Sequence, residues 1–177
     1  MPTQLQRRKF EKLFERLDAD HDGKVDQSDI DALVQGWCAT VNAAPGSGKW
    51  RQITASANTM WQEVQQRFSV KAGTAVTRDQ WVAAHDDPTF VDDVAIPMAM
   101  AAFELGDAEG EGKVSFARWM AGQTVSGLNQ AEAAELFRQL DRNGDGYVTK
   151  EEYAQAISEF YKSDDQGAVG NLMAGQL

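Results

Sequence analysis

Three segments of the chain share one strict spacing pattern, which limits the fold more than any other feature of the sequence. In each segment a phenylalanine lies four residues before an aspartate, a valine lies seven residues after it, and a large apolar residue lies five residues after the valine. The repeated aspartates are Asp18, Asp107 and Asp141. A fourth, weaker copy has Ser69 in place of the aspartate. Such a recurring unit is a supersecondary element that buries its apolar face against its neighbours.

The segments around each polar loop have the apolar periodicity of amphipathic helices. The face that precedes the first loop carries Phe10, Leu13, Phe14 and Leu17. Similar spacings recur before the second loop and on both sides of the last loop. We therefore expect an all-α protein, with four helix–loop–helix units in two pairs packed into a compact globule. In each pair the loop valines should meet across a short two-stranded bridge.

Turn-forming residues divide the predicted units. Residues 42–49 form a Pro- and Gly-containing linker within the first pair. A joint between the pairs falls at 85–88, because the residue before Pro88 disfavours helix. We expect an N-terminal pair over 1–87, a C-terminal pair over 88–162 and a tail over 163–177. The tail either folds back onto the C-terminal pair or frays, and Pro97 is expected to kink or open its helix.

The loop over residues 141–152 has an oxygen donor wherever a hard divalent cation needs one. Calcium takes about six to eight oxygens, which a twelve-residue loop supplies from positions 1, 3, 5, 7, 9 and 12, with glycine at 6 for the turn. The expected side-chain ligands are Asp141, Asn143, Asp145, Thr149 (directly or through a water) and Glu152, with the backbone carbonyl of Tyr147. The pattern predicts a calcium site.

The loop over residues 18–29 follows the same pattern with one change. The expected ligands are the side chains of Asp18, Asp20, Asp22, Asp26 and Asp29, with the backbone carbonyl of Lys24. Asp29 occupies position 12, where it is one methylene shorter than glutamate and should bind through one oxygen. The lower coordination number makes Mg²⁺ a competitor for Ca²⁺, since Mg²⁺ requires an octahedron.

The other two loops are predicted to be structural. The loop over 107–118 carries Arg118 at position 12, where a cation repels a metal ion, and it has glutamates at positions 3 and 5. We expect its valine, Val114, to pair with Val148, and Arg118 to neutralise the acids of its own loop. The loop over 69–80 has no carboxylate at positions 1, 3, 5 or 12 and carries Lys71 at position 3. We expect it to bind no ion.

With these loops the chain resembles the EF-hand family, and within it the sarcoplasmic calcium-binding proteins and their bacterial relative calerythrin. The resemblance rests on the two intact loops, the degenerate loop at 69–80, the long spacing before it, and Pro97 ahead of the third loop. It implies a compact globule whose helices bury their apolar faces against one another. Arg118 departs from the family pattern, since the third loop is often functional in these relatives.

The resemblance leaves several functions open. An intracellular Ca²⁺ or Ca²⁺/Mg²⁺ buffer is favoured over a sensor that exposes a groove to a target protein. The reason is that Met60, Met98, Met100 and Met120 are scattered rather than gathered in one groove. A photoprotein or luciferin-binding-like carrier is a remote alternative: five tryptophans would suit a cavity, but the two histidines are His21 and His85, and none follows the fourth loop. We expect no enzymatic activity.

Charge and composition limit the partners. The net charge of −10 argues against nucleic acids and anionic membranes as partners. The sequence contains no run of about 18 apolar residues, and its first residues lack the apolar core of a secretory leader. The single cysteine, Cys38, is expected to be a buried thiol in a reducing compartment. We therefore expect a cytoplasmic monomer.

Overall fold

Helices flank the polar loops of the computed structural model, which describes residues 1–67 and 74–177. The first half contains α1 (Gln4–Leu17), β1 (Lys24–Val25), α2 (Gln27–Thr40), α3 (Gly48–Arg67), β2 (Val76–Thr77) and α4 (Arg78–His85). The second half contains α5 (Pro88–Phe90), the π-helix η1 (Val91–Ala95), α6 (Ile96–Gly106), β3 (Lys113–Ser115), α7 (Phe116–Val125), α8 (Gln130–Leu140), β4 (Tyr147–Thr149), α9 (Lys150–Lys162) and the 3₁₀-helix η2 (Val169–Ala174). The predicted all-α class is confirmed. The beginning of the predicted loop 69–80 lies outside the described residues.

Reciprocal side-chain caps explain where the helices after the loops begin. In a capping box the N-cap side chain accepts a bond from the third residue of the helix, whose own side chain accepts one from the N-cap. These pairs are Asp26 with Asp29, Thr77 with Gln80, and Thr149 with Glu152. At α7, Ser115 makes no such cap, because the third residue is Arg118, which has no acceptor.

The loops are joined in pairs by short antiparallel bridges, as predicted. Val25 pairs with Val76, and Val114 pairs with Val148. Val25, Val76 and Val148 are fully buried. Each bridge therefore fixes two loops side by side and also anchors them in the core.

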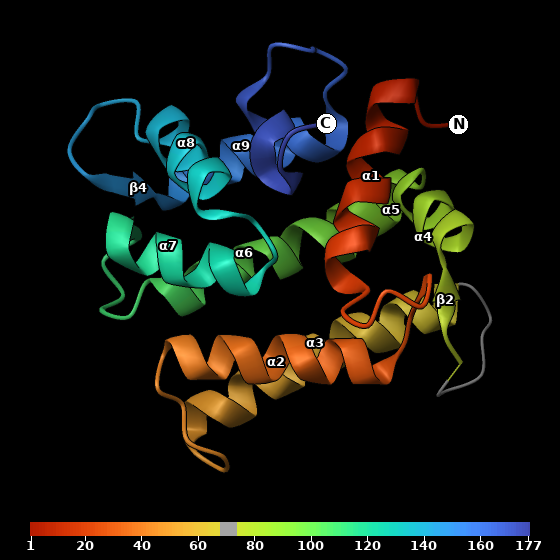
Figure 1. The fold of residues 1–177 in the computed structure, drawn as a ribbon, viewed down its shortest axis with the longest axis horizontal. Coiled ribbons are helices and arrows are strands. Elements are labelled where there is room, and N and C mark those ends of the chain that lie inside the picture. Colours follow the sequence, from red (N-terminus) through yellow and green to blue (C-terminus); the bar gives the residue numbers. More distant parts are fainter. Residues whose placement is uncertain (68–73) are drawn as a thin grey trace.

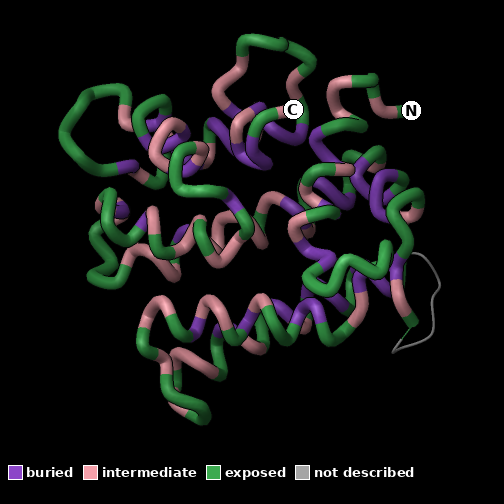
Figure 2. Tube along the Cα trace, in the orientation of Figure 1, coloured by how far each residue is buried: buried purple, intermediate pink, exposed green. Residues whose placement is uncertain are grey.

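The helices stack in layers, with α2 and α3 below α6 and α7, and α8 and α9 above these (Figure 1). Helix α1 crosses beside the layers, and α2 packs against α7 of the second half. The buried side chains of both halves belong to one apolar cluster, which runs through the interior (Figure 2). The two halves thus share one core.

A π-helical turn, η1, lies at the joint between the halves. Helix α4 ends at His85, and the Asp87 carboxylate caps the next segment by accepting the Thr89 N–H at 2.8 Å. Pro97 lies in the first turn of α6, directly after η1. Proline lacks an N–H and crowds the carbonyl four residues earlier, which favours a widened turn here.

A buried lysine connects the entering helix of the first loop to the exiting helix of the fourth. The Lys9 side chain on α1 is fully buried. Its Nζ donates to the carbonyls of Phe160 at 3.1 Å and Ser163 at 2.9 Å. These carbonyls lie at the end of α9, where a helix leaves its last carbonyls without partners. The Lys9 ammonium, within the core, therefore donates hydrogen bonds to carbonyls at the end of α9 that would otherwise lack partners.

The tail lies on α9 and α8 through η2. Gly170 makes the close approach possible: a Cβ on this residue would lie 2.4 Å from the carbonyl oxygen of Ala156 and 2.5 Å from the Phe160 nitrogen. Its N–H donates to Glu159 Oε2 at 3.1 Å. Nearby, the Asn171 amide donates to the carbonyls of Asp165 and Gln166. A residue without a side chain is thus required where η2 meets α9.

Gly170→Ala is expected to detach the tail from α9, because the added methyl meets rigid backbone rather than a movable side chain. Overpacking of this kind costs about 1–3 kcal/mol. Hydrogen exchange should show faster exchange over 163–177. Gly167→Ala is the matched control, since its Cβ would meet only the Asp165 carboxylate at 3.4 Å. Equal protection of the tail in the parent and in Gly170→Ala would contradict this account.

Candidate metal centres

The loops at 18–29, 107–118 and 141–152, here called loops 1, 3 and 4, make the same sharp turn. Positions 4 and 6 have left-handed backbone in each loop. Position 4 is His21, Gly110 or Gly144, with φ of 59°, 68° and 69°, and position 6 is Gly23, Gly112 or Gly146, with φ of 84°, 74° and 83°. Glycine adopts this conformation without a steric cost, and histidine is one of the few other residues found there.

The aspartate at position 1 organises each turn. Its two oxygens accept the N–H groups of positions 5 and 6. In loop 1, Asp18 accepts from Asp22 at 3.1 Å and from Gly23 at 2.9 Å. Asp107 and Asp141 accept the equivalent N–H groups at 2.8–3.1 Å. The shared phenylalanine–aspartate spacing thus places one carboxylate at the centre of every loop.

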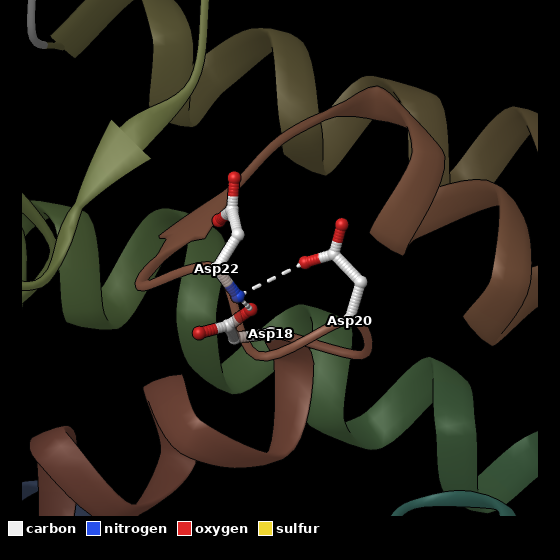
Figure 3. A group of neighbouring side chains, drawn as sticks. All are labelled: Asp18, Asp20 and Asp22. Atoms are coloured by element: carbon white, nitrogen blue, oxygen red, sulfur yellow. Dashed lines mark hydrogen bonds between the residues drawn. The ribbon is translucent and has the colours of Figure 1, made fainter.

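Loop 1 gathers three carboxylates. Asp18, Asp20 and Asp22 each have a carboxylate oxygen within 4.8 Å of the others (Figure 3). Asp20 also accepts the Asp22 N–H at 3.1 Å, and Asp22 accepts the Lys24 N–H at 2.8 Å. Carboxylates this close repel one another unless a cation lies between them. The donor set is therefore suited to a hard divalent ion.

The acid at position 12 closes the loop in both predicted sites. Asp29 accepts the Ala19 N–H at 2.9 Å and the Asp26 N–H at 2.8 Å. Glu152 accepts the equivalent N–H groups of positions 2 and 9, Arg142 at 3.4 Å and Thr149 at 2.9 Å. The side chain of position 12 thus joins the start of the loop to the start of the following helix. A change at this position affects both the ligand set and the helix cap.

The remaining predicted ligands of the two sites lie in equivalent places. Asn143 accepts the Asp145 N–H at 3.0 Å and Asp145 accepts the Tyr147 N–H at 2.9 Å, as their counterparts do in loop 1. Lys24 and Tyr147, expected to offer carbonyls, lie in β1 and β4. Asp26, at position 9 of loop 1, accepts hydrogen bonds from the hydroxyl and the backbone N–H of Ser28. These bonds hold the pKa of the Asp26 carboxyl below its usual range.

Loop 3 has the same turn but lacks an acid at position 12. Glu111 pairs with Lys113 at 3.1 Å, so its charge is already compensated. Arg118 is exposed and forms no ion pair within residues 1–67 and 74–177. The expectation that Arg118 neutralises the acids of its own loop was wrong, because lysine from β3 does so instead. Position 12 of loop 3 consequently contributes neither an acceptor nor a helix cap.

Two contacts near the sites have no counterpart in the repeat pattern. Arg16, two residues before the first loop, donates from Nε to the Ser126 carbonyl and from Nη1 to the Met173 carbonyl at 2.6 Å. Lys9 contacts the end of α9 in the same way. Both basic residues lie on α1 and donate to the C-terminal half, and local periodicity gave no signal for either. Among the contacts near the sites, the capping boxes are the ones whose spacing could have been recognised in the sequence, as in the pair Thr149 and Glu152.

Comparisons with known proteins agree with this geometry. The family model described as EF hand matches residues 10–34 and 133–157, which contain loops 1 and 4. Calerythrin from Saccharopolyspora erythraea is 22% identical over 167 residues, covering 91% of this chain and 94% of calerythrin. A Streptomyces coelicolor calcium-binding protein has a similar structure, with a TM-score of 0.72, 24% identity and coverage of 90% of this chain and 99% of that one. A sarcoplasmic calcium-binding protein from amphioxus has a TM-score of 0.71, 17% identity and full coverage of both chains.

The fold and the two acidic loops define a calcium-binding protein built from EF hands. Within that class, the chain is similar to calerythrin in sequence and to a sarcoplasmic calcium-binding protein in fold. In the described part of the chain, no helix combines the length and apolar character needed to cross a membrane.

Proposed function

We propose that the protein is a cytoplasmic calcium buffer that holds one divalent ion in loop 1 and one in loop 4. The proposed ligands in loop 1 are Asp18, Asp20, Asp22, Asp26 and Asp29, with the Lys24 carbonyl. Those in loop 4 are Asp141, Asn143, Asp145, Thr149 and Glu152, with the Tyr147 carbonyl. Loop 3 is proposed to bind no ion tightly, and loop 1 to exchange Ca²⁺ for Mg²⁺.

The observation that favours a buffer is the mutual burial of the helices. Apolar side chains from both halves share one core, and η2 occupies the surface of α9 and α8. Among the described residues, the large hydrophobic side chains classed as exposed are Met1, Phe116 and Tyr147. A sensor needs an apolar groove that opens to a target when calcium binds. Here η2 covers part of the surface that such a groove would use, on α9 and α8.

A sensor is the second candidate. The similar protein from Streptomyces coelicolor is described as acting in prokaryotic calcium-mediated regulation. The same role for this chain would require a part of the core to open, and release of the tail from α9 would uncover apolar surface. We do not propose a photoprotein-like role, because His21 lies in loop 1, His85 precedes the joint, and the sequence has no histidine after loop 4.

A buffer and a sensor differ in how much apolar surface they expose after calcium binding. An environment-sensitive apolar dye should bind the calcium-loaded protein no more than it binds the metal-free protein if the chain is a buffer. Gly170→Ala, in which the tail is expected to detach, serves as the positive control for an uncovered groove. A several-fold rise in dye fluorescence upon adding calcium to the parent protein would overturn the buffer assignment and favour the sensor.

Asp29→Glu is expected to make loop 1 more selective for calcium over magnesium. A glutamate at position 12 can bind with both oxygens, which raises the coordination number above the six that Mg²⁺ accepts. We expect the ratio of the Mg²⁺ and Ca²⁺ dissociation constants to rise by about tenfold, equivalent to about 1.4 kcal/mol. Calorimetric titrations in the Glu152→Gln background would isolate loop 1. An unchanged ratio would show that Asp29 does not limit the coordination number.

A further inference from the structure

A cavity of about 450 Å³ is lined by residues of both halves, mainly from α1, α2, α4, α6, α7 and α9. Its walls are mostly apolar and include Leu33, Trp37, Met98, Ile157 and Met173. This volume is within the range of pockets that hold small molecules. None of the proposed calcium ligands lines the cavity, so calcium binding does not explain it.

The charges around the cavity are unlike those of the chain as a whole. The sequence has 27 acidic and 17 basic residues, yet the lining contains two arginines, Arg16 and Arg118, and no aspartate or glutamate. Arg118 is exposed and therefore lies where the cavity meets the solvent. An apolar cavity that is lined by positive charge alone is suited to an anion with an apolar body.

Arg16 lacks a carboxylate partner. Its guanidinium donates to the carbonyls of Ser126 and Met173, which uses two of its five N–H groups. No ion pair joins it to an acid within residues 1–67 and 74–177. An arginine guanidinium keeps its charge at neutral pH. Glu132 is near enough to favour that charge but forms no ion pair with it, so an anionic ligand in the cavity could pair with the guanidinium directly.

Other side chains that can donate hydrogen bonds line the same cavity. Two of them are the phenols of Tyr153 and Tyr161. Neither hydroxyl has a hydrogen-bond partner in the described part of the chain. The buried indole N–H of Trp81, also in the lining, has no partner there either. These groups could donate hydrogen bonds to an anion in the cavity.

We propose that this cavity binds an apolar monocarboxylate, whose carboxylate pairs with Arg16 and whose alkyl chain lies along the apolar walls. The guanidinium and the phenols would donate to the two carboxylate oxygens, while the walls exclude water from the chain. An amine of the same length would be repelled by Arg16, and an alcohol would lose the charge-assisted bonds. This site is separate from the calcium loops and from the proposed buffering.

The test compares three ten-carbon probes, namely decanoate, decanol and decylamine, with calcium kept saturating. Binding can be followed through the tryptophans, since Trp37, Trp81 and Trp119 line the cavity. We expect decanoate to bind about 10- to 100-fold more tightly than decanol, as charge-assisted hydrogen bonds do relative to neutral ones. Decylamine should bind more weakly than decanol. Octanoate should bind more weakly than decanoate by about fourfold per methylene removed.

Two variants test separately the pairing of the ligand carboxylate with Arg16 and the placement of the alkyl chain in the cavity. Arg16→Gln should lower decanoate binding to the level of decanol, whereas Arg8→Gln, an exposed arginine on the same helix, should change neither. Ala102→Phe, which adds a ring to the lining of α6, should abolish binding of both probes while two calcium ions still bind. The proposal is overturned if decanol binds as tightly as decanoate to the parent protein. It is also overturned if Ala102→Phe retains decanoate binding, because the ligand would then lie elsewhere.

Discussion

Glu152→Gln is expected to reduce the number of tightly bound calcium ions from two to one. Glu152 is the acid at position 12 of loop 4, where a carboxylate can bind calcium with both oxygens. Glutamine lacks the negative charge and one of the two carboxylate oxygens that can bind calcium. EF-hand affinity depends on the charge count of the ligands. We expect the affinity of loop 4 to fall by about 100-fold or more. Calorimetric titration of the metal-free variant would measure the remaining stoichiometry.

The neighbouring Glu151→Gln is the matched control for this result. It removes the same charge from the first turn of α9, but Glu151 is exposed and is not a proposed ligand. Both ions should therefore still bind with nearly unchanged affinity. If Glu152→Gln also bound two ions tightly, the assignment of position 12, and with it the register of loop 4, would be incorrect.

Removing calcium is expected to lower the melting temperature by about 15 °C or more. A ligand present at about 1,000 times its dissociation constant stabilises the folded state by about 4 kcal/mol per site. Two sites therefore contribute about 8 kcal/mol, and each kcal/mol shifts the melting temperature of a chain of this size by about 2–4 °C. The carboxylates of Asp18, Asp20 and Asp22 reinforce the effect, because they repel one another without the ion.

Calorimetric scans in chelator and in about 10 μM free calcium would measure this shift, and the same scans on Glu152→Gln should give about half of it. Halving is expected because the variant retains only the contribution of loop 1. A shift of less than about 5 °C in the parent would mean that neither loop holds calcium tightly.

The features that could be predicted from the sequence are those fixed by local spacing. The turn needs left-handed backbone at fixed positions, and the loop valines fall at one distance from the repeated aspartates. The pairing of Val25 with Val76 and of Val114 with Val148 followed from this spacing and is confirmed. The ligand assignment in loops 1 and 4 remains a prediction, which their matching hydrogen bonds support.

The features that could not be predicted depend on contacts between distant segments. Lys9 reads as one more exposed base on an amphipathic helix, yet it is buried against the end of α9. Arg16 likewise gives no local sign that it reaches Ser126 and Met173. Proximity in sequence suggests that Arg118 pairs with the acids of its own loop, but Lys113 pairs with Glu111 instead. The cavity follows from the packing of elements from both halves of the chain and has no pattern in any one of them.

A calorimetric titration would show whether two of the four loops bind calcium. Calcium would be added to the metal-free parent protein with about 1 mM magnesium present. We expect two ions with dissociation constants of about 10⁻⁸ M, the range of calcium buffers whose sites also take magnesium. Two ions bound at about 10⁻⁷–10⁻⁵ M would keep the sites but favour a sensor. A third tightly bound ion would contradict the assignment of Arg118, and a single ion would contradict one of the two sites.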